Sequence, residues 1–212
     1  MVLSYLNVIS RSACVLAVGC FVWGATSAPA AAQVSADQII NALAPPPATR
    51  GLTAPETKPM NESDRAFVKS LRHRTRSLTF EESERVADMS KDWKKIDLEI
   101  YFDYNSARID PEAEPQLKEL GEALRNSRLS NATVVVGGHT DGKGSQSYNE
   151  RLSDRRAEAV KRYLVEKLNV PADNLATAGY GKRHLKNAND PYAPENRRVQ
   201  IVNAPETESA SR

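Results

Sequence analysis

Residues 132–160 read ATVVVGGHTDGKGSQSYNERLSDRRAEAV, and the order of elements in this segment indicates the fold class. It opens with a short apolar run at 132–136, which is typical of a strand in the centre of a sheet. A glycine-rich polar loop follows, and then a helix is expected from about residue 145 to about residue 168, where Asn169 helps to stop it. A buried strand that leads through such a loop into a long helix favours an α/β protein.

The flanking sequence completes this sheet. Alternating apolar and polar residues at 95–102 predict a half-buried strand. A second helix is expected from the cap residue Asp110 to about residue 129, and short strands are expected at 175–179 and 197–202. The apolar stripe of that helix is Ala113, Leu117, Leu120 and Leu124. The order predicts an α/β (α+β) two-layer sandwich, a mixed β-sheet with two main helices on one face.

The N-terminus has the features of a secretory signal peptide. Arg11 is its only charge, and the apolar run 13–25 is followed by small residues that end in an A-x-A-like sequence. Cleavage is therefore expected after Ala32. One alternative is an uncleaved membrane anchor, which needs about 20 predominantly apolar residues. Another is a lipoprotein, in which Cys20 would carry the lipid.

Composition argues against several classes of function. The formal net charge of +2 is too small for the basic excess of nucleic-acid-binding proteins. Both cysteines, Cys14 and Cys20, lie within the expected signal peptide, so the exported chain would have none for a disulfide or a metal. The histidines are far apart and form no HxxxH pair. No metal and no cofactor are expected.

Between the signal peptide and the sheet, residues 33–92 are expected to form a helical and linker region. Ser35 and Gln38 have the spacing of a capping box at the start of one short helix, and Thr79 and Glu82 have it at the start of another. The segment between these helices holds a cluster of prolines, which indicates an extended linker.

A basic stretch at 62–76 could touch an anionic lipid or polymer, but a solvated segment is the favoured interpretation. The chain is then divided into a signal peptide at 1–32, the helical and linker region at 33–92, a folded domain at 93–204 and a disordered tail at 205–212.

The helix that follows the glycine-rich loop carries an unusual arginine. At 100° per residue, Arg156 falls in the middle of the inward stripe, and Asn149 points the same way. The other members of that stripe are Tyr148, Leu152, Ala159, Val160 and Tyr163. A core-facing guanidinium is costly unless a group pairs with it, and Asp141, on the loop before the helix, is the nearest candidate.

An acid and an arginine that face one pocket can hold a zwitterion. The carboxylate of Asp141 would take an ammonium group, and the planar fork of Arg156 would take a carboxylate. The alternative is a structural ion pair between Asp141 and Arg156 with no ligand. The residues alone leave both possibilities open.

Three separated motifs resemble the OmpA C-terminal-like (OmpA/Pal/MotB) domain family. They are the stretch 138–160, Tyr101-Phe-Asp103, and Asn196-Arg-Arg-Val199, and the resemblance covers about residues 95–204. It implies non-covalent binding of peptidoglycan through the diaminopimelate of the stem peptide, with Asp141 on its amino group and Arg156 on its carboxylate. Further contacts implied by the family are Phe102, Asp103, Thr140, Asn149, Leu152, Arg197 and Arg198. Adjacent strand residues point to opposite faces, so only one of the two last arginines is expected to face the pocket.

The resemblance implies a protein of the Gram-negative cell envelope, in the periplasm or associated with the outer membrane, that contributes to envelope integrity and is not an enzyme. The alternative within the family is a Pal-like outer-membrane lipoprotein, a scaffold that recruits envelope protein partners. A catalytic triad of His139, Asp141 and Ser145 or Ser147 has no supporting geometry, so no catalytic residue is expected.

Overall fold

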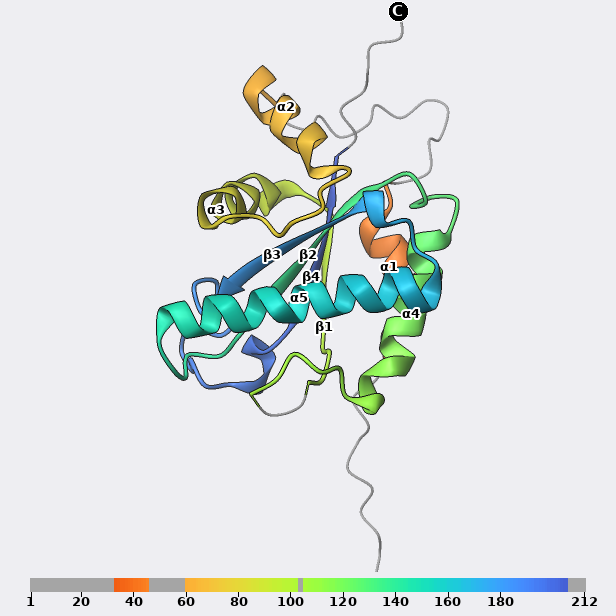
Figure 1. Cartoon of the computed structure of the whole chain (residues 1–212). Helices are drawn as coiled ribbons and strands as arrows, with labels where there is room; N and C mark the ends of the chain where they lie inside the picture. The colour runs from red at the N-terminus through yellow and green to blue at the C-terminus, as the bar shows by residue number, and fades with distance from the viewer. Residues whose placement is uncertain (1–32, 46–59, 103–104, 206–212) are drawn as a thin grey trace, which may run out of the picture. The chain divides into compact units, whose positions relative to one another are not determined.

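In the computed structural model, a four-stranded mixed sheet has the order β1-β4-β2-β3 (Figure 1). The structure describes residues 33–45, 60–102 and 105–205. Predictions about the signal peptide, both cysteines, the proline-rich segment, Asp103 and the tail from residue 206 therefore lie outside the described residues. The strands are β1 (Lys95–Leu98), β2 (Thr133–His139), β3 (Leu175–Gly181) and β4 (Val199–Ala204). β2 is parallel to β3, whereas β4 is antiparallel to both β1 and β2.

Two main helices cover one face of the sheet, as expected. They are α4 (Glu114–Arg125), which the short 3₁₀ turn η2 (Pro111–Ala113) precedes, and α5 (Gln146–Leu168). Their apolar residues share one core with the strand residues Val134, Val136 and Ile201. The expected stripe of Ala113, Leu117, Leu120 and Leu124 is buried. This face forms the fold predicted from the sequence.

The bounds of α5 agree with the prediction. The Ser145 hydroxyl accepts a hydrogen bond from the Tyr148 backbone at its start, and Asn169 closes its end in the left-handed conformation. Its buried face, however, is rotated from the expected one. Ser153, Ala157 and Leu164 are buried, while the predicted members Tyr148, Ala159 and Tyr163 are only partly buried.

Glycine explains this rotation. A Cβ atom on Gly138 would lie 2.2 Å from the backbone oxygen of Ser153, so only glycine lets α5 come this close to β2. The same holds where Gly179 of β3 faces Asp154. The helix therefore packs on the sheet through small residues, and a prediction based on the spacing of large apolar side chains does not find this face.

The opposite face of the sheet is covered by α2 (Glu62–Leu71) and α3 (Phe80–Met89). The sequence predicted α3, but neither α2 nor the packing of these helices on the sheet. The covering residues are Val68, Leu71, Leu78 and Val86, and they pack with Val135, Ala176, Ala178, Tyr180 and Val202 of the sheet. Both expected capping boxes are formed, at Ser35 for α1 (Ala36–Leu43) and at Thr79 for α3.

Hydrogen bonds connect residues 33–45, which include α1, to α4 and β4. The side chain of Gln116 both accepts from the Val34 backbone nitrogen, at 2.8 Å, and donates to the Val34 oxygen, at 2.9 Å. Asn203 donates to the backbone oxygen of Leu43 at 2.9 Å. Since α1 also shares the core of α4, residues 33–45 are an integral part of this face.

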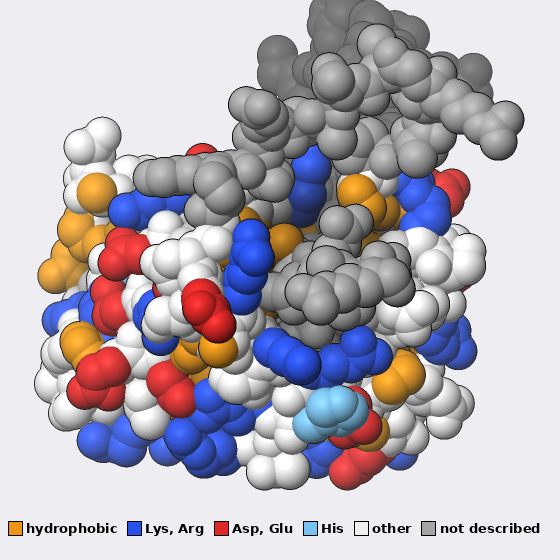
Figure 2. All heavy atoms as spheres, turned by 90° about the horizontal axis from the view of Figure 1, so that it is seen from above, with side chains coloured by type: hydrophobic (Ala, Val, Ile, Leu, Met, Phe, Trp, Pro, Cys, Tyr) orange, Lys and Arg blue, Asp and Glu red, His pale blue; other side chains and the backbone are white. Residues whose placement is uncertain are grey.

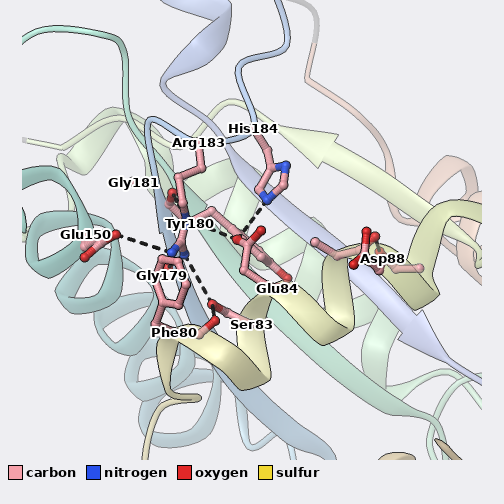
Figure 3. A network of polar contacts seen from close by, with 12 residues as sticks. Phe80, Ser83, Glu84, Asp88, Glu150, Gly179, Tyr180, Gly181, Arg183 and His184 are labelled. Atoms are coloured by element: carbon pink, nitrogen blue, oxygen red, sulfur yellow. Dashed lines mark hydrogen bonds and ion pairs between the residues drawn. The ribbon is translucent and has the colours of Figure 1, made fainter. Parts of the chain in front are cut away.

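On the other face, Arg183 joins α3 to the loop after β3, as Figure 3 shows. Its guanidinium lies 3.1 Å from Glu84 and 3.3 Å from Glu150, donates to Ser83 at 3.2 Å, and stacks 4.1 Å above the Phe80 ring. Acidic and basic side chains are interspersed on the surface seen in Figure 2, in keeping with the net charge of +2.

Several element bounds differ from the sequence prediction. β1 ends at Leu98, and beyond it Phe102 forms only an isolated bridge with Ile109. α4 ends at Arg125 rather than near residue 129, whereas β2 and β3 each run longer than expected. Within residues 33–45, 60–102 and 105–205, no helix is long and apolar enough to cross a membrane.

Candidate functional site

The predicted site residues gather where β2 ends and α5 begins. Thr140 is buried, and its backbone nitrogen donates to the oxygen of Gly181 at 2.9 Å. The loop then turns at Gly144, whose φ of +94° suits glycine. The side chain of Asn149 is buried and donates to the oxygen of Lys143 at 2.9 Å. These contacts hold the loop against the first turn of the helix.

Asp141 is the carboxylate of this loop. Its Oδ1 accepts from the Lys143 backbone nitrogen at 3.1 Å, and its Oδ2 lies 3.1 Å from Nη1 of Arg197. Its side chain is 19% exposed, so a ligand can reach it. An ionised carboxylate has about four acceptor positions, so Asp141 can also accept from an ammonium group while it keeps both contacts.

Arg156, on α5, is buried, with only 9% of the residue exposed. Its Nε donates to the backbone oxygen of Ser106 at 3.0 Å, and its guanidinium carbon lies 4.8 Å from the centre of the Phe102 ring. Burial lowers the pKa of Arg156, but a guanidinium stays charged in proteins. Within the part of the chain that the structure describes, neither Nη atom of Arg156 has a hydrogen-bond partner. These two donors are available to a ligand.

Beyond the expected Phe102, the loop between β1 and α4 contributes Asn105 and Ser106 to the surroundings of the site, which the sequence did not predict. Asn105 has a φ of +54° and its side chain forms a hydrogen bond with the hydroxyl of Tyr148, which was expected to be a core residue. Ser106 contributes only a backbone oxygen. A backbone acceptor carries no residue-type signal, so sequence reasoning had no means to find it.

The two neighbouring arginines point to opposite sides, as the alternation rule predicts. Arg197 pairs with Asp141, whereas Arg198 is buried on the α3 side with its Nε 3.2 Å from Asp97. Arg198 thus does not join the site. The suggested ion pair between Asp141 and Arg156 is not formed among the residues that the structure describes, because Asp141 pairs with Arg197 instead.

The remaining candidates are placed as follows. Leu152 is buried on α5, one turn before Arg156, and Phe102 is partly buried beneath the guanidinium. His139 stacks on Tyr180 at 4.8 Å between ring centres, on the α3 side of the sheet. The described parts of the chain contain no cluster of three or more residues that could hold a metal ion.

The architecture places a buried arginine and a loop carboxylate beside the end of a central strand of a mixed sheet, and these two side chains are chemically complementary to a ligand that carries both charges. Residues 101–198 match the model of the OmpA family, and this part of the chain is an OmpA family domain. The relatives of this part of the chain include outer membrane protein A.

Among these relatives, outer membrane protein A of Escherichia fergusonii is 39% identical over 84 residues, 40% of this chain and 34% of that protein. Outer membrane protein Omp38 of Acinetobacter baumannii is 40% identical over 85 residues, 40% of this chain and 23% of that protein. The solved peptidoglycan-associated lipoprotein of Burkholderia pseudomallei aligns with a TM-score of 0.43 and 26% identity over 50% of this chain and 88% of that one. The match spans about a third or less of the two curated relatives.

Proposed function

We propose that the OmpA family domain binds peptidoglycan non-covalently, through the diaminopimelate of the stem peptide. The observation that carries the proposal is Arg156, a buried guanidinium with both Nη atoms unpartnered among the described residues and the Asp141 carboxylate in its neighbourhood. The Nη atoms of Arg156 are open to solvent, unlike the buried Nη1 of Arg198, so a ligand carboxylate would replace water there with two charge-assisted hydrogen bonds.

The chemistry of diaminopimelate suits these two side chains. Its far end carries an amino group and a carboxylate on one carbon atom. Arg156 would donate two hydrogen bonds to the carboxylate, and Asp141 would accept from the ammonium. Arg197 neutralises Asp141 in the absence of ligand and would add a second positive charge toward the ligand carboxylate. The process is binding alone, with no bond made or broken.

The family supports this assignment, since the OmpA-like domain family is known for peptidoglycan association in envelope proteins. We place the protein in the periplasm, or associated with the outer membrane, where it would contribute to envelope integrity. In this proposal residues 1–32 direct export and 93–204 bind the polymer. Residues 33–45 and 60–92 complete the folded unit through their contacts with both faces of the sheet.

Sedimentation with two peptidoglycans tests the proposal. The purified protein should pellet with insoluble peptidoglycan that contains diaminopimelate. It should pellet much less with a lysine-containing polymer, because lysine lacks the carboxylate that Arg156 would bind. Free diaminopimelate should release the bound protein in a concentration-dependent manner. Equal pelleting with both polymers, without competition by the free amino acid, would contradict the assignment.

A further inference from the structure

A cavity lies on the face of the sheet that α3 covers, and the peptidoglycan proposal does not use it. Its volume is about 220 Å³. Lys91 and Lys95, which follow α3, line one side, and His139, Tyr180, Arg198 and Gln200 of the sheet region line the other. His139 and Arg198 face this side, whereas Asp141 and Arg156 form the site at the start of α5.

Two side chains in this cavity have polar atoms that nothing in the described chain satisfies. His139 is 3% exposed, and neither of its ring nitrogens has a hydrogen-bond partner among the described residues. Arg198 is 7% exposed; its Nη2 donates to the oxygen of His184, but its Nη1 has no partner there. Buried donors are normally paired, and leaving them unpaired is unfavourable.

The charges around the cavity favour an anion. Lys91, Lys95 and Arg198 line it; Lys91 pairs with the single lining carboxylate, Asp88, at 3.0 Å, and Lys95 donates to the backbone oxygens of Ser90 and Lys91. The carboxylate of Asp97 pairs with Arg198 at 3.2 Å, and Lys186 also lies 3.2 Å from this carboxylate. Asp97 therefore offsets only one of those two cations.

His139 adds a neutral donor to this positive surrounding. Burial, and next the charge of Arg198, hold the pKa of His139 well below its usual value of 6.5. A neutral imidazole presents one N–H donor and one acceptor nitrogen. An anion in the cavity can therefore receive a hydrogen bond from His139 without the cost of placing a second full positive charge there.

We propose that this cavity is a second binding site, which takes a small oxyanion, a phosphate or a carboxylate group, on Nη1 of Arg198 and the N–H of His139. The volume is several times the roughly 30 Å³ that one water molecule occupies, so such a group fits. The wall formed by α3 is firmly placed, because Glu84 binds both Arg183 and His184 of the opposite loop (Figure 3).

Titration of the full protein with inorganic phosphate, and separately with acetate, tests this site. The side-chain ¹⁵N resonances of His139 should shift and saturate, with a dissociation constant on the order of 1 mM for at least one anion. The matched variants are Arg198→Gln and Arg155→Gln, because Arg155 is an exposed residue of α5 that belongs to neither site. Arg198→Gln should weaken anion binding roughly tenfold or more, while Arg155→Gln should leave it unchanged.

A second variant, which removes the donor of His139, keeps the proposal testable if Arg198→Gln does not fold. His139→Phe retains an aromatic ring against Tyr180 and should fold. Phosphate should raise the melting temperature of the wild type, and this increase should be smaller in His139→Phe. His139 resonances that stay unchanged with both anions would show that the cavity holds only water and would overturn the proposal. Equal effects of the two arginine variants would also overturn it. The site does not depend on peptidoglycan binding, so either proposal can fail alone.

Discussion

Replacement of Arg156 probes the proposed peptidoglycan site most directly. Arg156→Ala removes the guanidinium, whereas Arg156→Lys keeps the charge and removes the planar pair of donors. Arg155→Ala is the matched control, since Arg155 is the preceding residue of α5 and is exposed. Only the variants at position 156 are expected to lose peptidoglycan.

The size of the effect follows from the contacts. Two hydrogen bonds from the Nη atoms to a carboxylate, each contributing about 1.5–3 kcal/mol, suggest a loss of about 3 kcal/mol after allowance for non-additivity. This corresponds to roughly a 140-fold weaker affinity for Arg156→Ala. Arg156→Lys should be intermediate, because a lysine cannot donate two parallel hydrogen bonds to the carboxylate.

The fold should survive these substitutions. Arg156→Ala loses the hydrogen bond to Ser106 and the contact with the Phe102 ring, together about 1–2 kcal/mol. Part of that loss is offset, because a buried charge no longer has to be desolvated. Urea unfolding of each variant should therefore remain cooperative, with a midpoint only slightly below that of the wild type.

Quantitative sedimentation with diaminopimelate-containing peptidoglycan, run beside the unfolding curves, decides the matter. Undiminished pelleting of a well-folded Arg156→Ala protein would refute the proposed role of Arg156 in binding. If the variant unfolds while Arg155→Ala does not, Arg156 is mainly structural. Equal losses for Arg155→Ala and Arg156→Ala would point to non-specific electrostatic adhesion.

Two further predictions concern stability. Burial alone would raise the pKa of Asp97, but its hydrogen-bond partners and the charges of Arg198 and Lys186 outweigh burial and lower the pKa from 3.8. Because this pKa is lowered, ionised Asp97 stabilises the fold above its unfolded-state pKa, and this stabilisation is lost as the pH falls through the folded-state pKa. Asp97→Asn should therefore lower the free energy of unfolding by about 2 kcal/mol at neutral pH and by less in acid. Urea unfolding against pH measures this, and a constant difference would contradict it. Gly138→Ala should cost about 3 kcal/mol, because the added carbon meets the Ser153 backbone, while Gly144→Ala should cost only about 1 kcal/mol of backbone strain; equal unfolding midpoints would contradict this.

Local signals in the sequence predicted the elements well. The capping boxes at Ser35 and Thr79 and the start of α5 after Ser145 depend on residues within one helical turn, and all are formed. The loop that carries Asp141 likewise follows directly from the strand and helix on either side. These features are encoded by neighbours in the chain, which is why one sequence is enough to predict them.

The remaining features depend on contacts between distant residues. Nothing near Gln116 indicates that it binds the backbone of Val34, and the packing of α2 and α3 on the sheet is equally non-local. The alternation rule predicts that Arg197 and Arg198 face opposite sides, but which of them faces Asp141 depends on how the last loop folds back onto the end of β2. For Asp141, sequence proximity suggested Arg156 as its partner, whereas the fold brought a residue of the last loop closer.

The helices on both faces have a consequence for the boundaries of a soluble fragment. A fragment that begins at residue 93 would match the family motifs, yet it would uncover Val135, Ala176 and Val202 on one face. On the other face it would expose the leucines of α4 that pack against α1. Contiguous apolar patches of this kind promote aggregation. A soluble fragment should therefore begin near Gln33, well upstream of the recognisable domain.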